Sequence, residues 1–226
     1  MSESYYKPCK EFDICNRMKV LIGTTNPSKV KRFKDFLPDS GIEFLTLKDL
    51  GITTEPEESG NTPEENARIK AEFYGRFCDR VICNDSGLYF DCIPLDDPRQ
   101  PGLNIRSPQG RRLDDEEMIA YYSALLHRMG GRTLAYYIDG IAVYREGNVE
   151  SYLDEQGKLA AFYMVEKPSP NRHPGWPLDS LSVNKNTQTY FVDHGNIIYD
   201  SVKEHIVVGQ YRQRVVDFLK RALEIR

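Results

Sequence analysis

Short apolar runs alternate with helix-type patterns along the first ninety residues. The apolar runs that predict strands are 19–23, 43–47, 81–83 and 88–92. The segments with apolar residues at helical spacing, which predict helices, are 27–37 and 62–77. Strands and helices that alternate in this way are typical of α/β proteins, and we predict that class.

The rest of the chain predicts one helix, a β-rich segment and a last helix. A helical pattern at 114–129 ends at two glycines. A β-like segment follows at 133–166, then a loop rich in proline, asparagine and glycine at 167–177. Apolar residues recur at helical spacing over 201–225. Residues 1–17 show no periodicity, so we interpret them as an N-terminal extension and 18–226 as a single domain.

A polar tetrapeptide, Asn84-Asp85-Ser86-Gly87, separates two of the apolar runs, and we interpret it as a turn at the mouth of the sheet. Glycine in such a turn lets the backbone approach a ligand closely. The Asp85 carboxylate could hold a hard cation or take a proton from water. A turn-forming aspartate without chemistry would show the same pattern, so this motif alone leaves both interpretations open.

The segment Thr24-Thr25-Asn26-Pro27-Ser28-Lys29 follows the first apolar run and predicts a helix start. Pro27 suits the first helical position and Asn26 the N-cap. Lys29 then lies in the first turn, where the exposed N–H groups and its own charge favour an anion. An ordinary capped helix with a solvated lysine fits equally well. The segment contains neither a P-loop nor a dinucleotide fingerprint.

A third motif combines an acidic loop with a strong helix start. Residues 62–65, Thr-Pro-Glu-Glu, form a capping box with proline at the first helical position. Asn66 and Lys70 are four residues apart and therefore share one face of that helix. Glu57 and Glu58 lie in the loop before it, where acidic residues are usually just solvated.

In order and spacing, these motifs resemble those of the inosine triphosphate pyrophosphatase family, nucleotide pyrophosphatases of the Ham type. That family carries T-x-N-x-x-K, then E-x-G-x-T-x-x-E-N-A-x-x-K-A, then D-D-S-G-L. The corresponding runs here are T-T-N-P-S-K, E-E-S-G-N-T-P-E-E-N-A-R-I-K-A and N-D-S-G-L. The resemblance extends from Lys19 to about Gly102 and is thin afterwards.

Three departures concern the metal and the base. Asn84 replaces the family's first aspartate, which removes one negative charge beside the implied metal. The family's G-F-G-Y-D-P segment is replaced by residues 173–179, His-Pro-Gly-Trp-Pro-Leu-Asp. Its S-H-R signature is absent, and Gln210-Tyr211-Arg212 stands in the comparable place. The resemblance therefore supports triphosphate chemistry better than it supports the identity of the base.

The resemblance implies an elongated mixed sheet with flanking helices, whose two lobes enclose a nucleotide cleft, often in a homodimer. It implies Mg²⁺-dependent hydrolysis of noncanonical purine triphosphates, such as inosine or xanthosine triphosphate, to the monophosphate and pyrophosphate. Glu57 and Asp85 would hold the metal, with Glu58 as the alternative if the register of the acidic loop is off by one. Asp85 would also serve the attacking water as the catalytic residue. The residues expected to contact the nucleotide are Thr24, Asn26, Lys29, Asn66, Lys70, Ser86, Trp176, Asp179 and Arg212.

The composition limits the partners and the cellular compartment that we expect. The 226 residues carry a net charge of −4, which argues against a partner that is a nucleic-acid polymer. No apolar run reaches membrane-spanning length, and the polar start does not predict a signal peptide. Five cysteines without a C-x-x-C pair fit reduced thiols, so we expect a cytoplasmic protein. Two alternatives stay open: a pyrophosphatase for another or modified nucleotide, and a non-catalytic nucleotide-binding protein.

Overall fold

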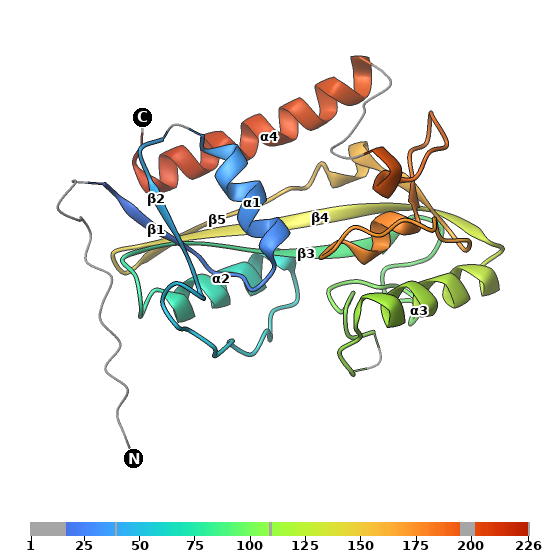
Figure 1. Cartoon of the computed structure of the whole chain (residues 1–226), viewed down its shortest axis with the longest axis horizontal. Coiled ribbons are helices and arrows are strands. Elements are labelled where there is room, and N and C mark those ends of the chain that lie inside the picture. Colours follow the sequence, from blue (N-terminus) through green and yellow to red (C-terminus); the bar gives the residue numbers. More distant parts are fainter. Residues whose placement is uncertain (1–16, 39, 109, 195–201, 226) are drawn as a thin grey trace. The chain divides into compact units, whose positions relative to one another are not determined.

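The computed structural model describes residues 17–38, 40–108, 110–194 and 202–225 (Figure 1). The extension predicted at 1–17 therefore lies outside the described residues, apart from Arg17. The helices are α1 (Pro27–Phe36), α2 (Pro63–Tyr74), α3 (Asp115–Arg128) and α4 (Val202–Leu223). The strands are β1 (Lys19–Ile22), β2 (Glu43–Thr46), β3 (Arg80–Phe90), β4 (Arg132–Arg145), β5 (Asn148–Leu153), β6 (Phe162–Val165) and β7 (Ser182–Val183). Short 3₁₀ helices are η1 (Gly157–Ala160), η2 (Pro177–Ser180) and η3 (Phe191–His194).

The strands form a mixed sheet, which confirms the predicted α/β class. Among the described residues the strand order is β2-β1-β3-β4-β6-β7, and β5 pairs with β4. β1 runs parallel to both β2 and β3, whereas β4 pairs antiparallel with β5 and β6. The four predicted helices are all present, to within about one helical turn at their ends.

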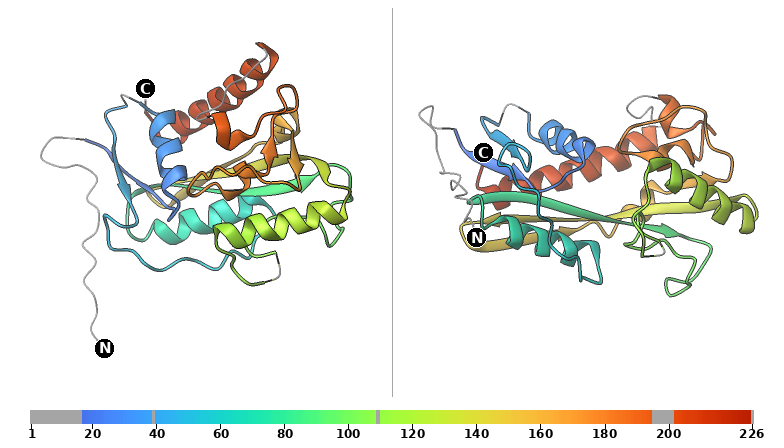
Figure 2. Two further views of the ribbon diagram at one scale, coloured as in Figure 1. Left: turned by 45° about the vertical axis from the view of Figure 1, so that its right-hand side comes forward. Right: turned by 60° about the horizontal axis from the view of Figure 1, so that its bottom comes forward.

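The described residues pack as two compact units. Unit 1 takes those within 17–85, 139–153 and 212–225, and unit 2 takes those within 86–138 and 154–211. β3, β4 and α4 each contribute residues to both units. In unit 1, α1 and the C-terminal part of α4 lie over one face of the strands, and α2 lies over the other (Figure 1, Figure 2). The extent of a single domain at 18–226 stays a prediction.

Each unit has its own hydrophobic core. In unit 1 the α2 residues Ala67, Ala71 and Tyr74 pack against strand residues that include Val81 and Cys83. In unit 2 the α3 residues Ile119, Tyr122 and Leu126 pack against strand residues that include Leu88, Phe90 and Met164. Burial of these apolar faces holds each helix on its strands, because it removes apolar surface from water. Within the described residues, no helix combines the length and the apolar character that a membrane crossing needs.

The turn predicted at Asn84–Gly87 is wrong. These four residues lie inside β3, which runs without a break from Arg80 to Phe90 and is buried along almost its whole length. Neighbouring strands pair with β3, and this pairing overrides the local preference of asparagine, aspartate, serine and glycine for a turn. Asp85 is therefore held in a buried strand of unit 1.

Candidate active site

The motif residues of unit 1 lie near the end of β1, where its parallel pairing with β3 stops. β1 stops at Ile22, and the next amide, that of Gly23, donates to the carbonyl of Ile82 in β3 at 2.9 Å. β3 continues from there to Asp85, while the chain after β1 leads into α1. Ligand sites of open α/β sheets lie beyond the carboxyl ends of such strands, at the helix start.

Gly23 brings the β1–α1 loop close to the core. A Cβ atom at this position would lie 2.5 Å from the Cys83 sulfur and 2.7 Å from the Tyr74 ring. The Cys83 thiol contacts the Gly23 carbonyl oxygen at 3.7 Å, and burial raises its pKa to about 12. The thiol therefore stays protonated and serves in packing.

The start of α1 has the predicted cap. The Asn26 side chain accepts from the backbone N–H groups of Ser28 at 2.8 Å and Lys29 at 3.4 Å, and Pro27 opens the helix. The Thr24 hydroxyl accepts from the Asn26 N–H at 3.1 Å, and the Thr25 hydroxyl donates to Glu55 at 3.2 Å. These bonds fix the loop that presents Lys29.

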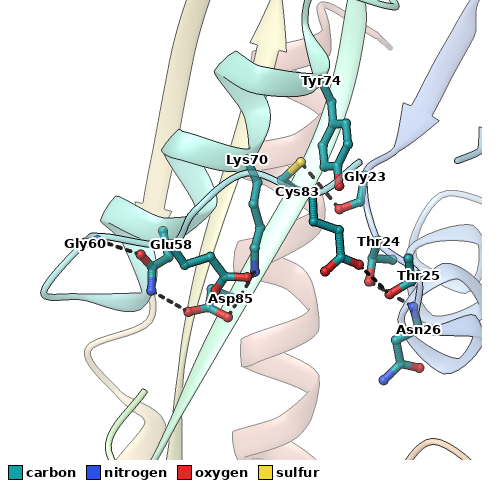
Figure 3. Close-up of polar contacts among 12 residues, drawn as sticks. Gly23, Thr24, Thr25, Asn26, Glu58, Gly60, Lys70, Tyr74, Cys83 and Asp85 are labelled. Carbon is teal, nitrogen blue, oxygen red and sulfur yellow. Dashed lines mark hydrogen bonds and ion pairs between the residues drawn. The ribbon is translucent and has the colours of Figure 1, made fainter. Parts of the chain in front are cut away.

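Asp85 lies at the centre of a polar cluster (Figure 3). Its carboxylate accepts from the Asn66 amide at 3.1 Å and contacts the Lys70 ammonium at 3.3 Å. The same ammonium pairs with Glu58 at 2.9 Å, so it lies between two carboxylates. The carbonyl end of Asn66 accepts from the Gly60 N–H at 2.8 Å, which ties the acidic loop to α2. The structure thus joins the acidic-loop motif (Glu58, Gly60, Asn66 and Lys70) and the Asp85 motif in one hydrogen-bonded network.

Burial and charge act on Lys70 in opposite directions. Burial alone would lower the pKa of its ammonium, but the attraction of Asp85 and Glu58 outweighs burial and raises it. Lys70 is therefore a fixed cation. Of the two glutamates considered, Glu58 joins this network, whereas Glu57 is exposed and makes no hydrogen bond or ion pair with the described residues.

Lys29 is in a different situation, although it belongs to the same unit. Its ammonium is half-buried and makes no hydrogen bond or ion pair within the described part of the chain. Burial, with repulsion from Lys70 and Arg32, lowers its pKa to about 8 against the partial offset of Asp85 and Asp139. An anion bound here would relieve both costs.

The sequence analysis did not identify two charged residues near Lys29, namely Arg32 and Asp139. Arg32 of α1 pairs with Asp139 of β4 at 3.2 Å, and both side chains are largely buried, with 21% and 12% exposed. The spacing of Arg32 three residues after Lys29 places the two on one helical face and could have indicated the first. A lone aspartate within the apolar run 134–143 could have indicated the second.

The two carboxylates of the cluster are ligands of the kind that a hard divalent cation takes. Within the described residues, no group of three or more histidine, cysteine, aspartate or glutamate side chains could hold a metal ion. Asp85 and Glu58 nevertheless converge on one cation, the Lys70 ammonium. Mg²⁺ commonly takes one or two protein carboxylates and completes its octahedron with water and substrate phosphates. Asp85 and Glu58 supply two protein carboxylates of the kind that such a site uses.

The other predicted contact residues lie elsewhere. Ser86 is half-buried in β3, in unit 2. Trp176 is half-buried, and its backbone N–H donates to the His173 carbonyl at 2.9 Å. The Asp179 carboxylate meets the His173 ring at 2.9 Å; burial raises its pKa, and His173 opposes that shift. Arg212 of α4 donates to the Asp35 carbonyl near the end of α1. The roles of these residues in binding the nucleotide stay predictions.

The comparison with protein families and curated proteins gives one consistent result. The model of the Ham1 family matches residues 20–190. A dITP/XTP pyrophosphatase of Bacillus subtilis is 38% identical over 45% of this chain and 50% of its own length. Another of that name, from Caldanaerobacter subterraneus, is 32% identical over 61% of this chain and 68% of its own. The chain spans about half the length of the first curated relatives that it matches.

Solved structures share the fold. A HAM1 protein from Coxiella burnetii has a TM-score of 0.63 at 20% identity, over 90% of this chain and 99% of that one. A structure titled nucleoside-triphosphatase / dITP/XTP pyrophosphatase, from Mycobacterium abscessus, has a TM-score of 0.58 at 22% identity, over 89% and 99%. Identities this low show the fold alone. Because the family model covers most of the sequence, the chain belongs to the Ham1 family.

Proposed function

We propose that this chain hydrolyses noncanonical purine nucleoside triphosphates, such as inosine and xanthosine triphosphate, to the monophosphate and pyrophosphate, with Mg²⁺ as cofactor. The observation that carries the proposal is the network in which Lys70 lies between Glu58 and Asp85, in the same unit as Lys29, whose ammonium has no partner among the described residues. The names of the curated relatives, dITP/XTP pyrophosphatases, support the same reaction.

In this proposal the phosphate chain binds at the start of α1. The hydroxyl of Thr24 and the amide of Asn26 lie in the loop before Lys29, and their mutual bond holds the loop ready. Lys29 contributes a cation that has no other partner among the described residues, and Lys70 contributes a second. Fixed donors and cations suit phosphoryl chemistry, because its catalysis is mostly positioning and charge neutralisation.

Asp85 and Glu58 would hold the magnesium ion, with Glu57 as the less connected candidate. Bound there with the nucleotide, Mg²⁺ would neutralise charge that develops on the phosphates. Asp85 would also act on the attacking water, since one of its oxygens accepts from Asn66 and the other contacts Lys70. A carboxylate fixed on both sides can orient that water and accept its proton.

The base would be read by side chains outside this network. Trp176 offers an indole face for stacking, and Arg212 offers donors for a purine carbonyl. Ser86 and Asp179 complete the set that we propose as nucleotide contacts. The bond of Arg212 to the Asp35 carbonyl holds this side chain at the end of α1, which favours a second candidate, a pyrophosphatase for a different or modified nucleotide. A cytoplasmic homodimer stays a prediction.

A pyrophosphate-release assay over a panel of purine and pyrimidine triphosphates, with and without Mg²⁺, tests the proposal. We expect monophosphate and pyrophosphate from the inosine and xanthosine substrates, and loss of turnover in excess chelator. Release of orthophosphate with a diphosphate would contradict the mechanism. Thermal stabilisation by nucleotides without turnover would instead identify a binding protein.

A further inference from the structure

Asn66 lies at the junction of α2, β3 and the acidic loop that precedes α2. The residue is only 3% exposed. Its carbonyl oxygen accepts from the Gly60 N–H at 2.8 Å, and its amide nitrogen donates to the Asp85 carboxylate at 3.1 Å. Both ends of this buried side chain are therefore engaged inside the protein, which leaves little of it for a nucleotide.

The Gly60 amide fixes which way round the Asn66 side chain lies. A backbone N–H can only donate, so the end of Asn66 that faces it is the carbonyl oxygen. The opposite end is then the NH₂ group, which can only donate, and Asp85 accepts from it. Asn66 thus links the position of the loop to a donor held against one carboxylate oxygen of Asp85.

The loop approaches α2 too closely at this point for a side chain on Gly60. A Cβ atom there would lie 2.7 Å from the Asn66 carbonyl oxygen and 2.9 Å from the Asn66 backbone nitrogen. The start of α2 is fixed as well. The Thr62 hydroxyl accepts from the Glu65 N–H at 3.1 Å, and the Glu65 carboxylate accepts from the Asn61 N–H at 2.6 Å. Loop and helix are therefore held together around Asn66.

Both carboxylates proposed as metal ligands depend on this arrangement. Glu58 lies two residues before Gly60 in the same loop, and Asp85 receives the Asn66 amide directly. Lys70, one turn after Asn66 on α2, pairs with Glu58 at 2.9 Å and with Asp85 at 3.3 Å (Figure 3). Loss of the Asn66 side chain would release the Glu58 loop and remove a donor from Asp85 at the same time.

We propose that Asn66 is a positioning residue and not, as the sequence suggested, a nucleotide contact: it orients Asp85 and holds the Glu58 loop, so that the two carboxylates converge. Its effect on the reaction rests on the proposed function. The hydrogen bond between Asn66 and Asp85 concerns the free protein alone.

An exchange of donor and acceptor tests this hydrogen bond without metal or nucleotide. Asn66→Asp keeps an acceptor for Gly60 but sets two carboxylates against each other. Asp85→Asn offers one acceptor to two donors, the Asn66 amide and the Lys70 ammonium. The double variant Asn66→Asp/Asp85→Asn again places a donor opposite an acceptor at each contact. In chemical unfolding with excess chelator, it should therefore unfold at a higher denaturant concentration than either single variant.

The matched control separates the hydrogen bond from charge balance. Asn61 is exposed and lies next to Gly60 in the same loop. Asn61→Asp combined with Asp85→Asn restores the net charge without restoring the bond, so it should be no more stable than Asp85→Asn. Asn61→Asp alone should keep the wild-type turnover.

Kinetics of Asn66→Ala, which removes both bonds, test the role in the reaction. We expect kcat to fall, and the Mg²⁺ concentration for half activity to rise, each by about 10–100-fold, the range for residues that orient metal ligands. KM for inosine triphosphate at saturating Mg²⁺ should be nearly unchanged. A purely structural role would reduce the amount of folded enzyme and leave the Mg²⁺ dependence where it is.

Recovered stability in the exchanged double variant, together with the magnesium shift in Asn66→Ala, would support the proposal. Equal recovery in the Asn61 control, or none in the exchanged variant, would overturn it. So would a raised KM with unchanged kcat in Asn66→Ala, which would make Asn66 a nucleotide contact. If Asn66→Asp does not fold, the comparison of Asp85→Asn with the two double variants decides. Absence of wild-type turnover on every triphosphate would count against the proposed function and leave the unfolding result intact.

Discussion

The cluster around Asp85 in unit 1 and the loop at 168–180 in unit 2 are connected in opposite ways. In the cluster, each contact joins different elements: Lys70 of α2 meets Asp85 of β3 and Glu58 of a loop. In the loop, most of the hydrogen bonds are internal, although Leu178 packs into the core of unit 2 and Arg172 pairs with Glu116 of α3. His173 meets Asp179, and its carbonyl accepts from Trp176, six and three residues away in the chain.

This difference indicates which kind of function each region suits. A network between elements exists only in the folded unit, so its charges are positioned before any ligand arrives, which is what phosphate chemistry requires. The polar side chains of the loop bond mainly within the loop, so they can differ between relatives with less effect on the rest of the fold. The family's E-x-G-x-T-x-x-E-N-A-x-x-K-A motif is retained in the network, whereas its G-F-G-Y-D-P segment has diverged in the loop.

The largest effect on turnover is expected for Asp85→Asn, because Asp85 is the central residue of the network. Loss of the carboxylate removes a proposed metal ligand and the base, so turnover should fall by about 10²–10⁴-fold or more. Stability should fall by about 1–3 kcal/mol, because Lys70 and Asn66 lose a charged partner in a buried site. Pyrophosphate release with inosine triphosphate and thermal unfolding measure the two effects.

The matched control is Asp91→Asn, the same chemical change just after the end of β3. Asp91 is exposed and pairs only with Lys158 among the described side chains, at 2.9 Å. This variant should keep full turnover. Near-normal turnover in Asp85→Asn would remove Asp85 from the mechanism and with it the contrast between network and loop.

Much of unit 1 was predictable because its signals are local. Capping residues and apolar spacing gave α1 and α2, and the spacing of Asn66 and Lys70 correctly placed them on one helix face. The continuity of β3 was not predictable. Asn84 to Gly87 are turn formers by themselves, and the place of β3 between β1 and β4 in the sheet keeps them extended.

The side-chain contacts between segments far apart in the sequence were also not predictable. The contact between Arg32 and Asp139 depends on β4 lying against α1, which no local pattern specifies. The choice between Glu57 and Glu58 depends on the path of the acidic loop, which is held by bonds to other segments, such as that from the Gly60 amide to Asn66. Such contacts follow from packing, so sequence patterns alone could not show them.

The second prediction distinguishes Glu58, which belongs to the network, from Glu57, which does not. Glu58→Gln should lower turnover by about 10–100-fold and raise the Mg²⁺ concentration for half activity, since it removes one of two converging carboxylates. Glu57→Gln should have little effect, because its side chain is exposed and lies outside the network. A magnesium titration of both variants checks this. A larger loss in Glu57→Gln would mean that the loop is rearranged when the nucleotide binds.

The third prediction concerns the loss of stability that results from burying the charged Lys29 ammonium in the free protein. Its folded pKa of about 8 lies below the unfolded value of 10.5, so the unfolded state binds more protons between these two values. Stability should therefore rise with pH across that window, and the cost is fully present below pH 8. Lys29→Met should stabilise the free protein by about 1–2 kcal/mol at pH 7 and by less as pH rises to 10.

Chemical unfolding at several pH values measures this, and Lys31→Met is the control. Lys31 lies on the same helix but is exposed and paired with Asp35, so its removal should change little. The Lys29 variant should also lose stabilisation by pyrophosphate. A variant that is no more stable than the wild type at pH 7 would show that Lys29 carries no electrostatic cost.

The smallest expected effect, and the one that tests the loop side of the comparison, is on base preference. Inosine and xanthosine present a carbonyl acceptor at the six position where adenosine presents an amino donor, so a fixed donor would leave a polar group unpaired against adenine. We expect inosine triphosphate to be preferred over adenosine triphosphate. Arg212→Ala should reduce the ratio of their kcat/KM values about fivefold, the worth of one net hydrogen bond.

Arg221→Ala is the control, because Arg221 is an exposed arginine on the same helix, and it should change neither ratio nor rate. Because Arg212 already donates to the Asp35 carbonyl, the competing outcome is specific: an unchanged ratio with lower thermal stability in Arg212→Ala would make it a cap for α1. The ratio of kcat/KM values for the two substrates then decides whether Trp176 and its loop read the base without help from α4.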